Sequence, residues 1–322
     1  MARIFVGIPT LDRPEYVMQT VAGLRAQRFG DWRAIVSDNG SDPETRDHIE
    51  RAIAALGDPR IGFYRQPSNL GEYGQGRFLF ALADECEMFM ILHDDDVLLP
   101  DMLARGVAAL ADAPDAALYV ADPWLIDRHG LRSPTRTQVY RHDHGRDVRP
   151  AGRFSILDTH LATGFTPISG TLFRTAALAE AGLVDSDCHG NFPFECNVML
   201  RLGDIGATGW FDPTPLIEVR YHAASLRNTL KLMNNPQVVR TMLTLFERRH
   251  YNGLNEQRRR TLVSRLHRAD ALIRLRQGDG EGSRAALASA CRANPRSVKA
   301  WMMRPLVSLA STKLTSMSGF ML

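Results

Sequence analysis

This 322-residue sequence has only four cysteines, and no two of them form a CxxC pair. That scarcity excludes a zinc ribbon and a disulfide framework, and it favours a reducing compartment. No uninterrupted apolar run approaches the ~20 residues that span a bilayer, and the apolar stretch at the N-terminus is too short for a signal peptide. We therefore expect a cytoplasmic protein.

The chain also has little net charge, +3 with histidines neutral, which gives no reason to expect a nucleic-acid partner. Acidic residues are missing after Glu281, although basic residues continue to Lys313. The length suits one large α/β domain with an appendage. We place the domain boundary near residue 230, which gives a sheet-containing domain at 1–230 and a helical C-terminal region at 231–322.

The first hundred residues alternate between strand and helix signals. Short apolar runs that favour strands are each followed by an amphipathic segment. The expected strands are Arg3–Ile8, Ala34–Val36, Ile61–Tyr64 and Met88–Leu92, and the expected helices are Glu15–Gln27, Pro43–Leu56 and Gly74–Ala83. This order predicts an α/β fold with a mostly parallel, Rossmann-like sheet flanked by helices on both faces.

The pattern is less regular after the fourth expected strand. Short strands are expected at Ala117–Val120, Thr171–Phe173 and Leu216–Tyr221, and helices at Asp101–Ala111, Thr175–Ala181 and Phe194–Leu202. Residues 128–153 form a polar stretch with seven arginines and little periodicity. We interpret this stretch, including His142-Asp143-His144, as a solvated loop that folds over a bound donor or grips an anionic acceptor. Everything from Gln237 onward is expected to be helical.

The segment MFMILHDDDVLLP at 88–100 is the most informative one. A buried strand here ends in Asp94, Asp95 and Asp96, and desolvating unpaired carboxylates costs several kcal/mol or more. A divalent cation with oxygen ligands, Mg²⁺ or Mn²⁺, satisfies such a cluster. The alternative is a solvated acidic turn leading to Pro100.

Polar residues also follow the other three expected strands. They are Pro9, Thr10 and Arg13 after the first strand, Asp38 after the second, and Asn69, Gly71 and Arg77 after the third. In a parallel sheet these ends share one edge, which is where open α/β folds bind ligands. Each cluster alone is more often a simple turn, but together they predict a site.

Several spaced segments resemble a known family. IPTLDRPEYVMQTVAGLRAQ, IVSDNGSD, NLGEYGQGR and ILHDDDVLLP resemble the opening half of a GT-A-fold glycosyltransferase of family 2. SGTLFRTAALAEAGLVDSD, FPFECNVMLRL and IEVRYHAAS resemble its second half more loosely. The resemblance covers about residues 3–225.

The resemblance implies an inverting, metal-dependent transferase that uses a UDP-, GDP- or dTDP-sugar donor. It places the nucleotide sugar on the strand-end residues above together with Asp94 and Asp95. It implies that the acidic run is the DxD element, and we favour Asp94 and Asp96 as the metal ligands, with His222 beside them. It implies that Glu195 is the catalytic base, which takes the proton of the acceptor hydroxyl.

The sequence departs from the family pattern at three places. His93 stands where an acidic residue is common, and Gly76-Arg77-Phe78 replaces the usual Ala-Arg-Asn. Phe194 takes the first acidic position of the motif that contains Glu195. One alternative function is a sugar nucleotidyltransferase of the same fold, but the turn that begins at Pro9-Thr10 does not resemble the glycine-rich loop of those enzymes. Another is a catalytically degenerate scaffold, suggested by Phe194, but retention of Asp94–Asp96 and Glu195 argues against it.

The acceptor and the setting are less specified. Family habit suggests a saccharide or lipid-linked acceptor in bacterial surface polysaccharide or glycolipid synthesis. The tail WMMRPLVSLASTKLTSMSGFML is apolar and without acidic residues, so we expect peripheral contact with the inner face of the cell membrane. The alternative is a helix docked in a domain interface or in a homo-oligomer.

Overall fold

The computed structural model describes residues 2–164, 166–186, 193–221, 233–305 and 307. The chain divides into two compact units. One is the sheet unit, Met1–Ser186 with Phe194–Ala223, and the other is the helical unit, Asp187–Pro193 with Ala224–Leu322. The predicted boundary near residue 230 falls outside the described residues, so the domain limits stay a prediction.

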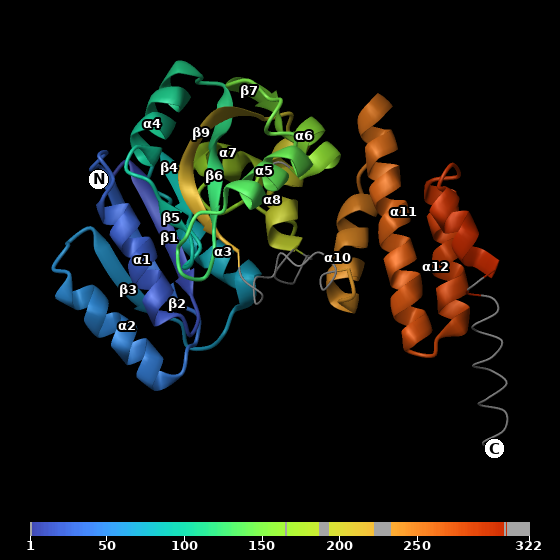
Figure 1. Ribbon diagram of the computed structural model, residues 1–322, viewed down its shortest axis with the longest axis horizontal. Coiled ribbons are helices and arrows are strands. Elements are labelled where there is room, and N and C mark those ends of the chain that lie inside the picture. The colour runs from blue at the N-terminus through green and yellow to red at the C-terminus, as the bar shows by residue number, and fades with distance from the viewer. Residues whose placement is uncertain (1, 165, 187–192, 222–232, 306, 308–322) are drawn as a thin grey trace. The chain divides into compact units, whose positions relative to one another are not determined.

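Four parallel strands open the sheet unit (Figure 1). They are β1 Ile4–Thr10, β2 Trp32–Asp38, β3 Ile61–Arg65 and β4 Met88–Ile91. The helices that connect them are α1 Pro14–Arg25, α2 Pro43–Ala55 and α3 Gly71–Ala81. The spatial order β3-β2-β1-β4 confirms the predicted α/β fold and places all four carboxyl ends at one edge.

Local sequence explains where these helices begin and which face they bury. Val17, Val21 and Leu24 of α1 are buried, as their i, i+4, i+7 spacing predicts. Asp42 precedes Pro43 and accepts a hydrogen bond from the Thr45 N–H at 3.0 Å, which caps α2 as expected.

The second half of the sheet is mixed in direction. Its strands are β5 Val97–Leu98, β6 Ala116–Ile126, β7 Gly152–Ser155, β8 Leu172–Arg174 and β9 Thr208–Arg220. β8 runs antiparallel between β4 and β6, and β9 pairs with β6 in parallel and with β5 and β7 antiparallel. The described residues of the sheet unit form nine strands of this sheet.

Helices α4 Met102–Asp112, α6 Ile156–Thr163, α7 Thr175–Ala181 and α8 Pro193–Asp204 complete this half. β6 and β9 are longer than their predicted apolar segments because they pair with each other along most of their lengths, polar residues included. Neither β5 nor α6 was predicted. Two residues, as in β5, are too few to show a period of their own.

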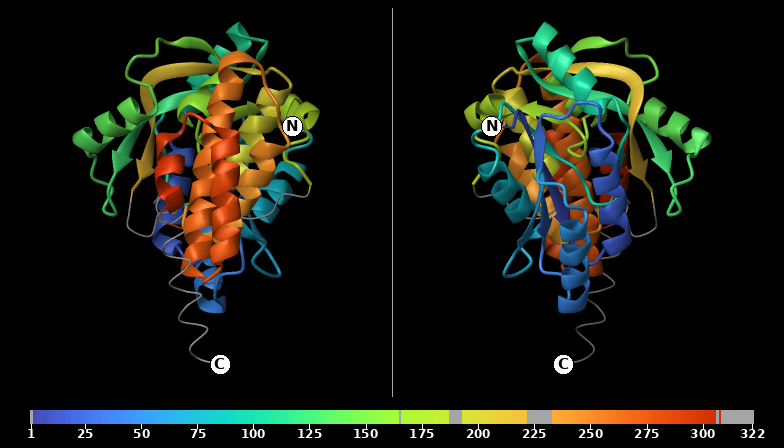
Figure 2. Two further views of the ribbon diagram at one scale, coloured as in Figure 1. Left: turned by 90° about the vertical axis from the view of Figure 1, so that its right-hand side faces the viewer. Right: turned by 90° about the vertical axis from the view of Figure 1, so that its left-hand side faces the viewer.

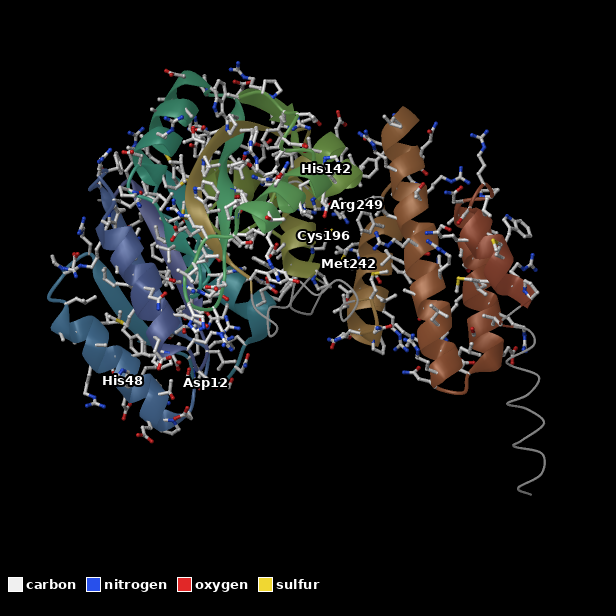
Figure 3. All side chains as sticks on the ribbon, in the orientation of Figure 1. Asp12, His48, His142, Cys196, Met242 and Arg249 are labelled. Carbon is white, nitrogen blue, oxygen red and sulfur yellow. The ribbon has the colours of Figure 1, made fainter. Side chains whose placement is uncertain are left out.

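The interpretation of residues 128–153 as a solvated loop is wrong. The segment contains α5 Pro134–Asp143 and leads into β7. The helix escaped prediction because Thr137 is its only buried residue, so it has no apolar periodicity. His142 lies on α5 (Figure 3) and bonds Asp147 at 3.0 Å.

Two arginines of that segment neutralise a buried carboxylate. Asp122 of β6 and Arg146 are both 0% exposed, and the Arg146 Nη1 lies 3.2 Å from the Asp122 Oδ1. The Arg141 Nε lies 2.9 Å from the other carboxylate oxygen. A charge buried this deeply needs a compensating partner, and the two arginines supply it. Arg141 and Arg146 are thus structural ion-pair partners in the sheet unit.

Three helices that the sequence predicts lie among the described residues of the helical unit. They are α10 Pro236–Glu247, α11 Gly253–Arg276 and α12 Gly280–Ala293. α11 and α12 lie side by side (Figures 1 and 2) because the connection between them is short. None of the helices in the described part of the chain has the length and apolar content to cross a bilayer.

Candidate active site

The acidic run lies just beyond β4, at the shared edge of the four parallel strands. Asp94 is buried, and its Oδ2 accepts a hydrogen bond from the Thr10 hydroxyl at 2.8 Å. The Arg13 guanidinium donates to Asp94 at 3.0 Å and to Asp95 at 3.1 Å. Burial raises the pKa of Asp94, and Arg13 opposes that rise. Thr10, Arg13, Asp94 and Asp95, all predicted site residues, thus form one network.

The Asp96 carboxylate accepts hydrogen bonds from residues in the second half of the sheet unit. One carboxylate oxygen accepts from the Ser169 hydroxyl at 2.5 Å and the other from the Arg220 N–H at 3.0 Å. The Arg220 side chain also donates to the Asp95 carbonyl at 3.0 Å and lies over the Tyr16 ring. Sequence reasoning missed Ser169 and Arg220 because both come from the part of the sheet whose pairing was not predicted.

Two groups of side chains at this edge have the composition and spacing of a metal site. In His93 with Asp95 and Asp96, one ligand atom from each residue lies within 4.8 Å of the others. The same holds for Glu72, His93 and Glu195. Carboxylate oxygens with one imidazole suit Mn²⁺, and the carboxylates alone suit Mg²⁺.

The predicted ligand pair was Asp94 with Asp96. The described residues bring Asp95 rather than Asp94 into the first of these groups, and the Asp94 carboxylate is hydrogen-bonded to Thr10 and Arg13. The third predicted ligand, His222, lies outside the described residues. The assignment of metal ligands among the three aspartates therefore stays a prediction.

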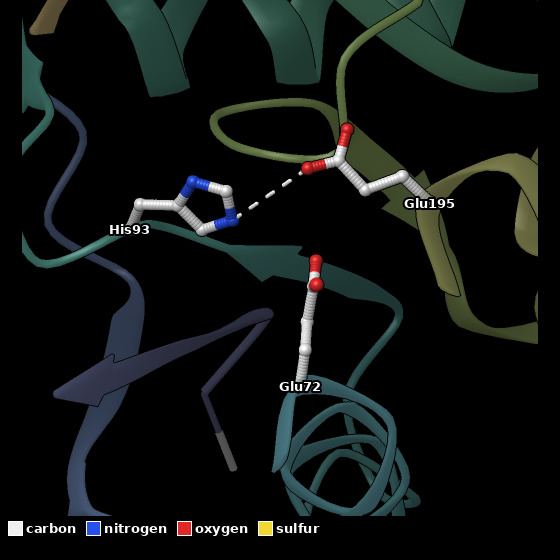
Figure 4. Close-up of side chains that lie close together, drawn as sticks. All are labelled: Glu72, His93 and Glu195. Atoms are coloured by element: carbon white, nitrogen blue, oxygen red, sulfur yellow. Dashed lines mark ion pairs between the residues drawn. The ribbon is translucent and has the colours of Figure 1, made fainter. Parts of the chain in front are cut away.

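Glu195 lies in the first turn of α8 and faces this edge (Figure 4). Its Oε1 is 4.0 Å from the His93 Nε2, and its side chain is partly exposed. Glu72 reaches the same point from the first turn of α3. Burial, and then the negative charge of Glu195, raise the pKa of Glu72 well above its usual range.

Two departures from the family pattern contact each other. Phe194 is buried, and a Cβ built on Gly76 would lie 2.1 Å from the Phe194 ring. The Tyr73 ring meets Phe194 edge-on at 5.8 Å between centroids. Phe194 therefore occupies the space that a side chain at 76 would take, and the sequence signal was the loss of both usual residues at once.

The helix pair α3 and α8 also carries the two glutamates. Glu72 lies four residues before Gly76, so the two share one face of α3. Glu195 directly follows Phe194 on α8. Position 194 therefore has no carboxylate, but Glu72 places a second carboxylate beside Glu195.

The loops after β2 and β3 are joined to each other. Asp38 is buried and accepts hydrogen bonds from the Gly40 and Ser41 N–H groups at 3.3 Å. The Asn69 Oδ1 accepts from the Asn39 side chain at 3.1 Å and from the Gly71 N–H at 2.8 Å. This arrangement stabilises the turns, and the predicted nucleoside contacts of these residues stay predictions.

Two further predicted residues lie apart from these networks. Pro9 is the penultimate residue of β1 and is partly buried. Arg77 lies exposed on α3. Their roles in donor binding likewise stay predictions.

Solved structures of similar shape cover nearly the whole chain. The crystal structure of residues 1–349 of TarS from S. aureus has a TM-score of 0.63 and is 15% identical, and the match covers 97% of this chain and 88% of that one. The mannosyltransferase PcManGT from Pyrobaculum calidifontis, in complex with GDP-Man and Mn²⁺, has a TM-score of 0.58 and is 15% identical, covering 96% and 86%. Identities this low show the fold alone, which is the GT-A fold.

Similarity in sequence identifies the family to which the chain belongs. The galactofuranosyltransferase GlfT2 of Mycolicibacterium smegmatis is 34% identical over 114 residues, which are 33% of this chain and 17% of GlfT2. The match spans about a sixth of the length of that curated relative. The model of glycosyl transferase family 2 matches residues 5–173, more than half of the chain, including β1–β4 and the acidic run. The chain belongs to glycosyl transferase family 2.

Proposed function

We propose that this protein is an inverting glycosyltransferase that moves a sugar from a nucleotide-diphosphate donor to a hydroxyl of a saccharide or lipid-linked acceptor. The observation that carries the proposal is the position of Glu195 beside the acidic run, at the carboxyl edge of the parallel strands. We further propose a role in bacterial surface polysaccharide or glycolipid synthesis, at the inner face of the cell membrane.

The donor assignment rests on the neighbouring structures. TarS was solved with UDP-GlcNAc and with UDP, and PcManGT with GDP-Man and Mn²⁺. In this chain the donor would lie along the ends of β1 to β4. Arg13 forms ion pairs with Asp94 and Asp95 there, which position both carboxylates.

A divalent cation fits the acidic run. Asp95, Asp96 and His93 offer converging ligand atoms, and Asp94 and His222 are the further predicted ligands. When bound, Mg²⁺ or Mn²⁺ supplies Lewis-acid stabilisation of the negative charge that develops on the leaving diphosphate. Ser169 and the Arg220 backbone keep the Asp96 carboxylate oriented for this role.

Glu195 is proposed to take the proton of the acceptor hydroxyl. A carboxylate that removes this proton as the oxygen attacks makes the hydroxyl a competent nucleophile. A single displacement from the face opposite the leaving diphosphate inverts the anomeric centre. Glu195 is partly exposed, which allows an acceptor to reach it.

The test combines a donor panel with one substitution. UDP-, GDP- and dTDP-sugars are incubated with the protein and Mn²⁺, and free nucleoside diphosphate is measured. We expect release from one donor class, and we expect Glu195→Gln to lower turnover by about 10²–10⁴-fold while donor affinity stays unchanged. Glu180→Gln, an exposed position on α7, is the matched control.

Near-normal turnover in Glu195→Gln would overturn the base assignment. No nucleotide release from any donor would favour the degenerate scaffold instead. Membership of family 2 already argues against a sugar nucleotidyltransferase.

A further inference from the structure

The two parts of the chain carry opposite net charge. Residues 224–322 contain 18 lysines and arginines and five acidic residues, which gives +13. Because the whole chain carries +3, residues 1–223 carry −10. Such a strong cationic excess in residues 224–322 indicates an anionic partner that the sugar-transfer site does not require.

A short helix at the end of the described chain packs one of its faces against α11 and α12. Residues 298–305 are helical. Ala300 is fully buried in a cluster with Ala290 and Cys291 of α12. Met303 and Val307 pack into a second cluster formed by residues of α11 and α12. The helix is therefore anchored on the unit by this side.

The opposite face of the same helix is apolar and exposed. Val298 is 67% exposed, Trp301 48% and Met302 66%. Their i, i+3, i+4 spacing places them together, away from Ala300 and Met303. We name these three residues the outer face. They form a cluster that the core of the helical unit does not use.

Basic residues border the outer face. At 3.6 residues per turn, Lys299 and Arg304 fall on opposite flanks of it, and both are exposed. The Arg304 guanidinium lies 5.2 Å from the centre of the Trp301 ring. The Trp301 Nε1 donates to the Pro295 carbonyl at 2.8 Å, which fixes the orientation of the ring.

We propose that the outer face, with Lys299 and Arg304, docks the helical unit on an anionic phospholipid surface. Apolar side chains of this kind enter the boundary between headgroups and acyl chains. Lysine and arginine beside them keep their charges at the lipid phosphates. The net charge of the unit favours an anionic bilayer over a second copy of the same cationic unit.

This inference deepens the proposed function, on which its biological meaning rests, because a lipid-linked acceptor is presented at such a surface. Membrane binding itself can be measured without any sugar transfer. The experiment therefore measures binding of the protein to vesicles, and donor hydrolysis is measured separately in the absence of vesicles.

The test is flotation of the full chain with two kinds of vesicle, pure phosphatidylcholine and equal parts phosphatidylcholine and phosphatidylglycerol. We expect the protein to float only with the anionic vesicles, with a blue shift of tryptophan emission. The triple substitution V298S/W301S/M302S and the double substitution K299Q/R304Q are each expected to lower the bound fraction roughly tenfold or more.

The matched control is L254S/L272S, which removes two exposed leucines of α11 outside the outer face. It is expected to leave flotation unchanged. Thermal unfolding midpoints check that each variant is folded, and K299Q/R304Q alters only exposed polar side chains.

Four results would overturn the inference. They are no flotation, equal flotation with neutral vesicles, undiminished binding of both V298S/W301S/M302S and K299Q/R304Q, and a dimer in solution that V298S/W301S/M302S abolishes. Vesicle binding without nucleotide release would sink the proposed function and leave the docking surface standing. Nucleotide release without vesicle binding would overturn the docking surface and leave the proposed function standing.

Discussion

At the scale of single residues, the acidic run has partners both near and far in the fold: Thr10 and Arg13 lie at or just after the end of β1, and Ser169 comes from a distant segment. A buried apolar segment followed by three carboxylates is visible in the sequence, since desolvation makes it unusual. Ser169 and Glu72 come from distant segments with no such signal. Their roles depend on long-range packing, which local patterns do not encode.

Glu72 is expected to act on Glu195 as a neutral neighbour. Because burial and Glu195 raise the pKa of Glu72, the protonated form is favoured, and glutamine imitates that form. Glu72→Gln should therefore retain most of the wild-type kcat. Glu72→Ala should lower kcat by roughly 10–100-fold, because it removes a partly buried polar group beside Glu195.

Steady-state nucleotide release with the preferred donor separates these outcomes, and donor affinity serves as the control. If Glu72→Gln were as inactive as Glu195→Gln, Glu72 would act as an anion. Equal activity of the glutamine and alanine variants would show that Glu72 contributes nothing to the base.

At the scale of elements, the helices and strands with an apolar period were predicted well, and those without one were not. α1 and α2 were found because of their buried stripes and the Asp42 cap. α5 was missed because polar residues cover nearly all of it. The sequence shows seven arginines there, but only the fold shows that Arg146 meets Asp122.

Removing one partner of that buried ion pair should strongly destabilise the sheet unit. Arg146→Met leaves the Asp122 charge with less compensation and should lower the free energy of unfolding by about 3–5 kcal/mol. Arg153→Met, which removes an exposed pair with Asp115, should cost no more than about 1 kcal/mol. Urea denaturation followed by circular dichroism measures both, and equal costs would refute the structural role of Arg146.

The contact between α3 and α8 predicts a second stability effect. Gly76→Ala places a Cβ against the Phe194 ring, and overpacking of this kind costs about 1–3 kcal/mol. That cost should exceed the gain in helix propensity from alanine, which is at most about 1 kcal/mol.

A double-mutant cycle with Phe194→Leu isolates this contact. In the leucine background the ring is gone, so Gly76→Ala should become much less costly. An unchanged cost in both backgrounds would show that the two departures from the family pattern are independent.

At the scale of the whole molecule, the sequence was sufficient for the class. Four strand ends on one edge, with spaced family motifs, predicted a GT-A glycosyltransferase, and the nine-stranded sheet and the family match confirm it. The donor sugar and the acceptor could not be predicted, because the shape of their pockets depends on side chains from many elements. The opposite net charges of residues 1–223 and 224–322 likewise become meaningful only once the division of the fold near residue 223 is known.

The most direct test of the central claim is NMR of the sugar that the protein releases from its preferred donor, with water as acceptor. The account predicts that the first anomer formed is inverted relative to the donor. It also predicts that chelation of divalent metal abolishes release, that Mn²⁺ or Mg²⁺ restores it, and that Glu195→Gln does not support it. A retained anomer, or undiminished release from Glu195→Gln, would contradict the account.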